Sequence, residues 1–578
     1  MSLQVSIKKS KEQKLLFYYV LVVWLLVNFL QSAFTGLLND EAYYWYYSLK
    51  LDWGYYDHPP MIALLIRAGD SLFPGVFGVR FFLVLLSGMV LWLIRELADT
   101  ENILLFFAFV FSIFIFHADG FVVSPDTVFV FFTALFFYAY KNYLKDDSPG
   151  NVLLLIIAVT GMFYSKYFAV LVVVFTIMAN ITIVKRRSFW LIFLLSVLAM
   201  IPHLIWQINH DFVTFYFHLK ERNVNTGFGL STVLEFLGGQ FLMMNPLVAW
   251  FLITGFLNRK ITTDFERVLW FNVVGVFGFA FLISFWKRVE ANWTIVAFIP
   301  LLLLAYPVME KKIKKNTKFK KQFYSLVSLS VLLVLVMRLN IAVDLFDLAN
   351  SGILKQFYGW KERAGKFERL AAGRPVVFSC SYQNASQYIF NTGQPSFTFN
   401  YLFYRKNQFD LDSIEPALLG KEVLFIKNTK VLDEHFRKPF EIPDPDSVLI
   451  ENEWWYFKNI QHYFTYNFLE IKIRLEKDKL PSGTEIRIPV ELVNPLDSAV
   501  VVAPGGKAWL TVCFAEKNRP YEFSKVEEIS GLKLDQSYKT ILKVKTPDRA
   551  GKYFLWVSVQ TDWLSPAINH RVYPVKVE

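Results

Sequence analysis

Apolar runs of about 20 residues recur along the first 345 residues, and each run is long enough to cross a bilayer as a helix. We predict spans at 15–36, 77–96, 102–118, 126–144, 151–165, 167–185, 188–208, 232–257, 267–286, 292–309 and 322–343. The chain is 54% hydrophobic with a mean hydropathy of +0.35, which is above the range of soluble globular proteins. The pattern therefore predicts an α-helical polytopic membrane protein with about eleven transmembrane helices.

The spans at 151–165 and 167–185 are separated only by Ser165-Lys166-Tyr167. One tilted helix with a buried Lys166 is the alternative, and it would reverse every span that follows. The basic clusters at 185–187 and 311–321 fall on the cytoplasmic side only if the pair counts as two spans. We therefore predict a cytoplasmic N-terminus and an extracytoplasmic C-terminus.

The stretch 39–60 follows the first apolar run and places Asp40, Glu41, Asp57 and His58 among Tyr and Trp rings. Carboxylates are costly at membrane depth, so a cluster of them at a membrane edge usually serves a site. Aromatic rings prefer the same boundary. An interfacial aromatic belt with solvated acids is the simpler interpretation. The other outer loops favour an active site at the water–lipid boundary.

Asp40 and Glu41 are the candidate catalytic residues. Neighbours on one helical turn diverge by about 100°, so both cannot point at one atom. One can face a reaction centre while the other orients a neighbour. Desolvation near the membrane and beside Trp45 would disfavour the charged carboxylate and make it a better base.

Asp57-His58-Pro59-Pro60 forms a second group. The two prolines fix the backbone and can start a helix at Met61. Asp57 and His58 would then lie at a helix N-terminus, which suits anions. A plain N-cap by Asp57 is the alternative.

Further polar residues occur in other outer loops. Asp126 opens a span and fits either a helix N-cap or a site residue. Lys166 lies between two apolar runs and either snorkels or meets a phosphate. Glu290 precedes Ala-Asn-Trp, and its simpler role is that of an interfacial anchor.

The outer loop after 208 adds cations. His218 and Arg222 are four apart and share a face if this piece is helical. Such a pair would suit a lipid phosphate. The predicted phosphate-binding residues are His58, Lys166, His218, Lys220 and Arg222. The further site residues are Asp57, Asp126 and Glu290.

After about residue 345 the composition changes. An amphipathic helix at 355–370, a helix at 383–390 and buried strands at 375–380 and 422–427 predict a small α/β layer. Alternating strands at 469–475, 484–493, 508–514, 540–544 and 553–559 predict a β-sandwich. The predicted domains are 1–344 (transmembrane), 345–445 (extracytoplasmic α/β) and 446–578 (extracytoplasmic β-sandwich).

The net charge of +11 comes from Lys and Arg in short clusters between apolar runs. That is the pattern of membrane topology, so we expect a membrane and no nucleic acid as partner. Cys380 and Cys513 show neither metal spacing nor a disulfide framework. Because no tight His/Asp spacing is visible, we expect no obligatory cofactor, although Asp57 with His218 could bind a divalent metal.

Several motifs together resemble a known family: Asn39-Asp-Glu-Ala-Tyr-Tyr-Trp, Tyr56-Asp-His-Pro-Pro, Ser124-Pro-Asp-Thr and Ser165-Lys-Tyr. They are similar to membrane glycosyltransferases of the GT-C class, in the dolichyl-phosphate-mannose–protein mannosyltransferase group. Bacterial relatives of this group include the aminoarabinose transferases that modify lipid A. Pro202-His-Leu-Ile-Trp and Glu290-Ala-Asn-Trp also match bacterial members. The resemblance covers roughly residues 15–400.

The resemblance implies a GT-C fold and a sugar donor on a polyprenyl phosphate, which is undecaprenyl phosphate in bacteria. It implies inverting transfer at the outer face of the bacterial inner membrane, to a lipid, glycan or protein acceptor. Asp40 matches the family's catalytic acid. His58 stands where aminoarabinose transferases carry Lys, so the chain departs from the family there. The β-sandwich is not part of the family core.

Two other functions are compatible with the composition. A transporter or lipid flippase would have many spans, yet it should show two similar halves and charges at mid-span. No repeat is visible, and the charges lie in outer loops. An envelope assembly protein could use the sandwich for binding, but it would not need convergent acids. A glycosyltransferase is therefore the favoured interpretation.

Overall fold

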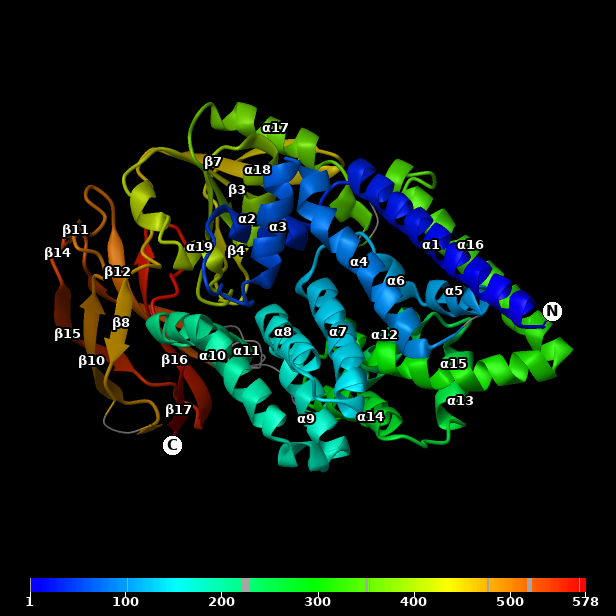
Figure 1. The fold of residues 1–578 in the computed structure, drawn as a ribbon. Coiled ribbons are helices and arrows are strands. Elements are labelled where there is room, and N and C mark those ends of the chain that lie inside the picture. The colour runs from blue at the N-terminus through cyan, green and yellow to red at the C-terminus, as the bar shows by residue number, and fades with distance from the viewer. Residues whose placement is uncertain are drawn as a thin grey trace. The chain divides into compact units, whose positions relative to one another are not determined.

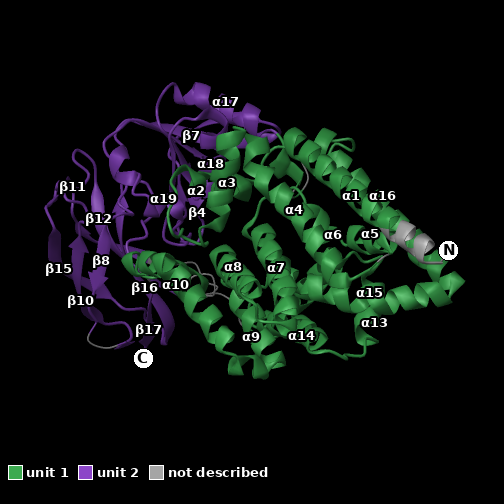
Figure 2. Cartoon of the chain, viewed as in Figure 1, with its two compact units in different colours: residues 1–358 green, residues 359–578 purple. Residues whose placement is uncertain are grey.

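The structure is a computed structural model that describes residues 2–100, 102–219, 228–348, 352, 354–475, 478–516, 522–570 and 572–578. Its contacts divide the chain into two compact units, residues 1–358 and 359–578, which Figure 2 colours separately. The finer prediction of domains at 1–344, 345–445 and 446–578 stays a prediction.

Unit 1 is helical (Figure 1). Helix occurs in every segment for which the apolar pattern predicts a span. The elements are α1 Ser2–Phe34, α2 Asn39–Leu49, α3 Met61–Leu72, α4 Val76–Ala98, α5 Ile103–Ser112, α6 Phe114–Ala118, α7 Pro125–Lys145, α8 Pro149–Ser165, α9 Ala169–Ala179, η1 Ile181–Lys185, α10 Arg187–Asn209, α11 Val213–Leu219, α12 Leu230–Met244, α13 Ala249–Leu257, α14 Asp264–Ser284, η3 Ala291–Ala297, α15 Phe298–Lys315, α16 Thr317–Val343 and η4 Leu354–Phe357.

Within the described ranges, six helices are long and apolar enough to cross a membrane. A seventh span results if α12 and α13, which meet at a bend of 98°, count as one. The predicted count of about eleven spans is not confirmed. The chain breaks between α8 and α9, where Lys166 has an extended backbone, so this part forms two helices as predicted.

The core of unit 1 lies between α5, α7, α13 and α15, with Phe109, Phe137, Phe251 and Phe298 all buried. α7 packs beside α4 and α8 (Figure 1). Because packing on most sides holds α7 in place, the polar residues at its two ends have fixed positions. The candidate site lies at the N-terminal end of α7.

Unit 2 contains a mixed sheet in the order β2-β1-β3-β7-β6. β1 is parallel to β2 and β3, whereas β7 is antiparallel to β3 and β6. The elements of this part are α17 Trp360–Ala371, β1 Val376–Ser379, α18 Tyr382–Thr392, β2 Ser396–Phe399, α19 Gln408–Leu411, η5 Glu415–Leu418, β3 Val423–Lys427, β4 Val431–Asp433, β5 Phe440–Glu441, β6 Asp446–Ile450 and β7 Glu453–Ile460. The predicted α/β layer is present.

The remainder of unit 2 is a β-sandwich, as predicted. A sheet ordered β15-β10-β8 and a sheet ordered β13-β12-β16-β17-β9 share one apolar core, to which Ile488 and Leu542 contribute from the first and Leu510 and Val557 from the second. The strands are β8 Glu470–Ile473, β9 Lys479–Leu480, β10 Glu485–Val493, β11 Val500–Val501, β12 Ala508–Ala515, β13 Glu522–Glu528, β14 Lys533–Leu534, β15 Ser537–Lys545, β16 Gly551–Thr561 and β17 Tyr573–Val577. Cys380 and Cys513 are both free thiols.

Candidate functional site

Glu41, in the first turn of α2, is buried and accepts four hydrogen bonds. Arg80 of α4 donates two of them, through Nε at 2.9 Å and Nη2 at 2.5 Å. The backbone amides of Leu38 (2.8 Å) and Val123 (2.7 Å) donate the others. A carboxylate with this set of donors is held in one orientation.

Arg80 is itself fully buried and satisfied. Its Nη1 donates to the backbone oxygen and hydroxyl of Thr35, and its Nη2 donates to the backbone oxygen of Gly36. The Glu41–Arg80 pair therefore joins the end of α1, the start of α2, α4 and Val123, which precedes the N-cap of α7. This geometry matches the orienting role expected of one member of the acidic pair, while the predicted catalytic role of Glu41 stays a prediction.

Asp40 is exposed, although it adjoins the buried Glu41. It starts a row at spacing i, i+3, i+4 and i+7 that continues with Tyr43, Tyr44 and Tyr47, and such residues share one helix face. The rings of this row touch: Tyr43 and Tyr47 lie 4.7 Å apart and Tyr44 and Tyr47 lie 5.9 Å apart between centroids. Asp40 is thus the water-accessible end of an aromatic face.

Asp57 lies at the other end of that face. The Tyr47 hydroxyl donates to the buried Asp57 carboxylate, and the Tyr47 ring stacks on Tyr55 at 4.4 Å. Burial, and then the negative charge of Asp57, raise the pKa of Tyr47 well above its usual value. Tyr47 therefore stays a proton donor to Asp57 at neutral pH.

The prediction that a helix starts at Met61 is confirmed, since α3 begins there. The residue at the N-cap position is Pro60, so the alternative in which Asp57 caps this helix is wrong. His58 contacts the Tyr44 ring edge-on at 5.5 Å and lies 6.3 Å from the His218 ring. His218 of α11 directs Nε2 at the backbone oxygen of Asp57, 2.9 Å away. The structure thus brings Asp57, His58 and His218 together.

Asp126, Lys166 and Asn292 form a second cluster at the N-terminal end of α7. Lys166 Nζ lies 2.5 Å from Asp126 Oδ1, and Asn292 Nδ2 donates to Asp126 Oδ2 at 2.7 Å. Asp126 and Lys166 are 5% and 9% exposed, so this is a buried ion pair and Lys166 does not snorkel freely. The N-cap of α7 is Ser124, which accepts from the amide of Thr127, so the N-cap interpretation of Asp126 is wrong.

Within the described part of the chain, Glu290 forms no hydrogen bond or ion pair with this cluster, and its Oε1 lies 3.8 Å from Arg288 Nε. The residue of the Glu290-Ala-Asn-Trp motif that reaches Asp126 is Asn292. Lys220 and Arg222 lie outside the described residues. Val123, whose amide binds Glu41, directly precedes the Ser124 cap, and this contact joins the two clusters.

A buried polar chain that sequence reasoning missed links the loop at 50–58 to α10. His203 contacts the backbone oxygen of Trp53 through Nδ1 (2.6 Å) and the Tyr167 hydroxyl through Nε2 (2.9 Å). Gln207 donates to the Tyr167 hydroxyl and to Thr214, which donates to the backbone oxygen of Tyr55. His203 and Tyr167 stood within the motifs that resembled the family, which was the available signal.

The described residues include no group of three or more His, Cys, Asp or Glu side chains that could hold a metal ion. Asp57 and His218 are neighbours, but His218 turns Nε2 to a backbone oxygen and Asp57 accepts from Tyr47. These two residues alone therefore do not form a metal-binding site. The expectation of no obligatory cofactor stays a prediction.

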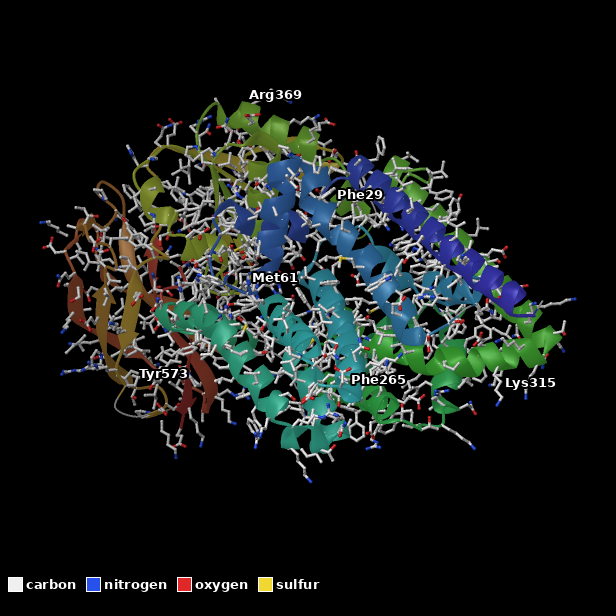
Figure 3. The ribbon with its side chains drawn as sticks, viewed as in Figure 1. Phe29, Met61, Phe265, Lys315, Arg369 and Tyr573 are labelled. Carbon is white, nitrogen blue, oxygen red and sulfur yellow. The ribbon has the colours of Figure 1, made fainter. Side chains whose placement is uncertain are left out.

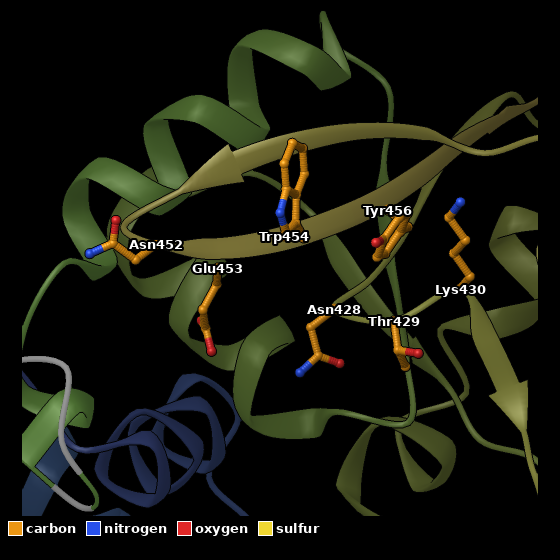
Figure 4. A pocket seen from close by; sticks show the side chains of 7 residues that line it. All are labelled: Asn428, Thr429, Lys430, Asn452, Glu453, Trp454 and Tyr456. Carbon is orange, nitrogen blue, oxygen red and sulfur yellow. The ribbon is translucent and has the colours of Figure 1, made fainter.

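A separate cavity of about 480 Å³ lies in unit 2, on the sheet that includes β7 (Figure 4). Trp454 and Tyr456 from β7, with Asn428 and Lys430 from the loop after β3, are among its lining residues. Lys430 lies over the Tyr456 ring at 5.3 Å. None of the predicted site residues that the structure describes lines this cavity.

Comparisons with known proteins agree with this architecture. A family model described as dolichyl-phosphate-mannose-protein mannosyltransferase matches residues 57–206, a range that contains Asp57, Asp126, Lys166 and His203. Lipid A galacturonosyltransferase RgtD of Rhizobium johnstonii (strain DSM 114642 / LMG 32736 / 3841) is 25% identical over 320 residues. That alignment covers 51% of this chain and 65% of the relative, so the chain spans less than two thirds of the relative's length.

Solved structures of ArnT from Cupriavidus metallidurans share the fold. The apo structure aligns with a TM-score of 0.52 at 12% identity, covering 78% of this chain and 98% of that one. The structure bound to undecaprenyl phosphate aligns with a TM-score of 0.50 at 12% identity, covering 77% and 97%. The chain has an ArnT-like fold. The predicted resemblance to this group and the predicted fold class are therefore confirmed.

Proposed function

We propose that this ArnT-like protein transfers a sugar from a polyprenyl phosphate to a lipid acceptor. The observation that carries the proposal is the contrast between Asp40, which is exposed, and Glu41, which is buried and fully bonded. An exposed acid whose backbone is fixed by such a neighbour suits a general base. The similarity to RgtD and to ArnT bound to undecaprenyl phosphate supports the reaction class.

In the proposed step, the acceptor hydroxyl oxygen forms a bond to the anomeric carbon and its proton passes to Asp40. The bond from that carbon to the phosphate oxygen breaks, and the electron pair stays on the phosphate. Attack opposite to the leaving group inverts the anomeric centre. The protein's part is to place both substrates and to stabilise the charge that develops on the leaving group.

His58 and His218 are the described residues closest to a phosphate role in this proposal. Their ring centroids lie 6.3 Å apart, and His58 contacts the Tyr44 ring edge-on, so two imidazoles lie together next to Asp57. Lys166 is a weaker candidate than the sequence predicted, because its charge is already paired with Asp126. Lys220 and Arg222 remain predicted phosphate ligands outside the described residues.

The finer features remain proposals. Undecaprenyl phosphate as the donor carrier and lipid A as the acceptor are supported by the names of the relatives. Glycan or protein acceptors, which the sequence left open, have no such support. Location in the bacterial inner membrane is proposed from the similarity to RgtD and ArnT, and a reaction at the outer face is proposed from the predicted topology.

The test is sugar transfer by the purified full chain, with undecaprenyl-phosphate sugars that include galacturonic acid as donors and lipid A as acceptor. We expect Asp40→Asn to slow transfer about 100-fold or more, because general base catalysis typically contributes about 10²- to 10⁴-fold. Donor binding, measured in parallel with radiolabelled undecaprenyl phosphate, should stay near that of the unmodified chain.

Asp99→Asn is the matched control. Asp99 follows the C-terminal end of α4, whereas Arg80 lies near its N-terminal end, roughly 28 Å along the axis at 1.5 Å per residue. The control should transfer normally. Near-normal transfer by Asp40→Asn would remove Asp40 from the mechanism and favour Asp57 or Asp126. Absence of transfer to lipid A from every donor would refute the proposed acceptor.

A further inference from the structure

A cavity of about 540 Å³ in unit 1 lies between the ends of α4, α7 and α14, and no step of the proposed reaction uses it. Four cations from three separate segments line it: Lys141 and Lys145 from α7, Arg186 from the start of α10 and Arg259 from the loop before α14. Phe265, labelled in Figure 3, lines it from the first turn of α14. We refer to it as the basic cavity.

The basic cavity lies at the end of the helices opposite to the candidate active site. α7 carries Asp126 in its first turn and Lys145 as its last residue, a separation of roughly 28 Å at 1.5 Å per residue. The hydrocarbon core of a bilayer is about 30 Å thick. α4 runs the same way, from Arg80 near the site to Leu97 and Ala98 at the cavity. The two sites therefore belong to opposite faces of the membrane.

The charges that face the basic cavity do not cancel. Glu266 pairs with Arg259, and Asp264 pairs with Arg267 at 2.8 Å. Glu96 and Asp99 lie near Lys141, and Glu96 pairs with Arg95. After these pairings Arg186 has no carboxylate bound to it among the described residues, Lys141 has Glu96 and Asp99 only at longer range, and Lys145 has its neighbour Asp146 nearby without an ion pair. The cavity therefore keeps an excess of positive charge.

Arg186 is oriented rather than neutralised. It donates from Nη1 to the backbone oxygen of Tyr143 (2.6 Å) and from Nη2 to that of Leu144 (3.3 Å), and its guanidinium lies 4.8 Å from the Tyr143 ring centroid. Carbonyls and a ring face fix a guanidinium in place without removing its charge. The Arg186 guanidinium therefore keeps its charge and can bind an anion without first reorienting.

Several donors at the basic cavity are unused. Lys141 Nζ donates to one acceptor, the backbone oxygen of Leu97 at 3.1 Å, although an ammonium has three donors. Lys145 forms no hydrogen bond or ion pair within the described ranges, and the buried Nε of Arg259 has no hydrogen-bond partner there. A buried donor without a partner is costly, so the retention of Arg259 Nε indicates an acceptor that completes it, whereas the exposed Lys145 offers a charge that an anion can reach.

Besides the four cations, the two acids and the polar Asn180, Thr182 and Thr263, the lining is apolar and includes Leu144, Ile183, Leu269 and Leu303. We propose that the basic cavity binds the headgroup of an anionic phospholipid from the leaflet opposite to the active site. The lipid phosphate accepts hydrogen bonds from the charged side chains, and the apolar lining residues pack against the glycerol and the first methylenes of the acyl chains. Basic pockets between transmembrane helices suit this ligand class. A free phosphate would use the donors but leave the apolar wall without a partner.

The experiment is native mass spectrometry of the purified full chain with added phosphatidylglycerol, with phosphatidylcholine and with inorganic phosphate. The variant is Lys141→Gln combined with Lys145→Gln. Lys315→Gln is the control, because Lys315 at the end of α15 is also an exposed lysine that does not line the cavity (Figure 3). Each lysine near an anionic lipid contributes about five-fold to binding, so the double variant should bind phosphatidylglycerol about 25-fold more weakly.

We expect the unmodified chain and Lys315→Gln to retain phosphatidylglycerol and to bind phosphatidylcholine and phosphate poorly. Equal retention by the double variant and the control would overturn the proposal. Equal binding of phosphatidylcholine, or preferential binding of inorganic phosphate, would also overturn it. If the double variant does not fold, Lys145→Gln alone decides, because the exposed Lys145 side chain forms no hydrogen bond or ion pair among the described residues. The readout is binding, so it is independent of the proposed transfer activity.

Discussion

Adjacent residues of one type can have opposite environments, and Asp40 and Glu41 show this at the scale of single residues. A helical step of about 100° turns Glu41 towards Arg80 and the Val123 amide while Asp40 faces water. The sequence predicted that the two acids would divide their roles. Which acid takes the structural role depends on Arg80, which is 39 residues away in the chain.

The first prediction concerns this buried pair. Removing one partner of a buried ion pair typically costs about 3–5 kcal/mol, because the other charge stays buried and unpaired. We therefore expect Arg80→Met to lower the thermal unfolding midpoint of the detergent-solubilised protein strongly, and Glu41→Gln to lower it less because the amide oxygen can still accept from Val123. Asp40→Asn should leave the midpoint unchanged.

The double variant Glu41→Gln with Arg80→Met serves as the control. It should lose less stability than the sum of the single losses, because neither charge then lies buried alone. Additive losses, or an unchanged midpoint for Arg80→Met, would show that the pair does not hold these segments together.

At the scale of elements, the loop at 50–58 is held from outside by α10, α11 and the break between α8 and α9. His203, Tyr167, Gln207 and Thr214 provide the contacts. The loop also packs closely at Gly54, where an added Cβ would lie 2.4 Å from the Trp206 ring. The loop carries Asp57, so α10 controls the geometry of a site to which it contributes no predicted residue.

The second prediction tests this support. His203→Phe keeps a ring but removes the contacts with Trp53 and Tyr167, each of which typically contributes about 1–3 kcal/mol when a partner is left unsatisfied. Backbone amides at 50–58 should then exchange with deuterium about ten-fold faster or more, as measured by mass spectrometry.

His210→Phe is the matched control for that measurement. His210 lies just after the same helix, but its Nδ1 contacts the backbone oxygen of Trp206 rather than the loop. It should leave exchange at 50–58 unchanged. Equal exchange in His203→Phe and in the unmodified chain would mean that the loop does not depend on α10.

At the scale of the whole molecule, two compact units follow one another along the chain. Unit 1 carries the helices that are long and apolar enough to span a membrane, and unit 2 carries the α/β sheet and the β-sandwich. α15 ends at Lys315 with basic residues in its last turn, and α16 starts after the Asn316 cap. This junction is the most basic turn between two spanning helices.

The third prediction concerns orientation. A reporter that is active only outside the cytoplasm should be active when fused after Glu578 and silent when fused after Lys315, since basic turns stay in the cytoplasm. Both fusions should be produced in equal amounts, as checked by immunoblotting. The reverse pattern would overturn the predicted span count and would place the basic cavity in the outer leaflet.

The sequence by itself determined the helical membrane unit, the α/β layer, the sandwich and the acidic pair in the first loop. Period, length and composition are local properties, so they can be read along the chain. It could not determine that Ser124 caps α7, that Lys166 pairs with Asp126, or that Asn292 rather than Glu290 completes the cluster. These outcomes depend on which side chains meet across distant segments. A buried charge is tolerated only beside its partner, and only the tertiary packing decides which partner is within reach.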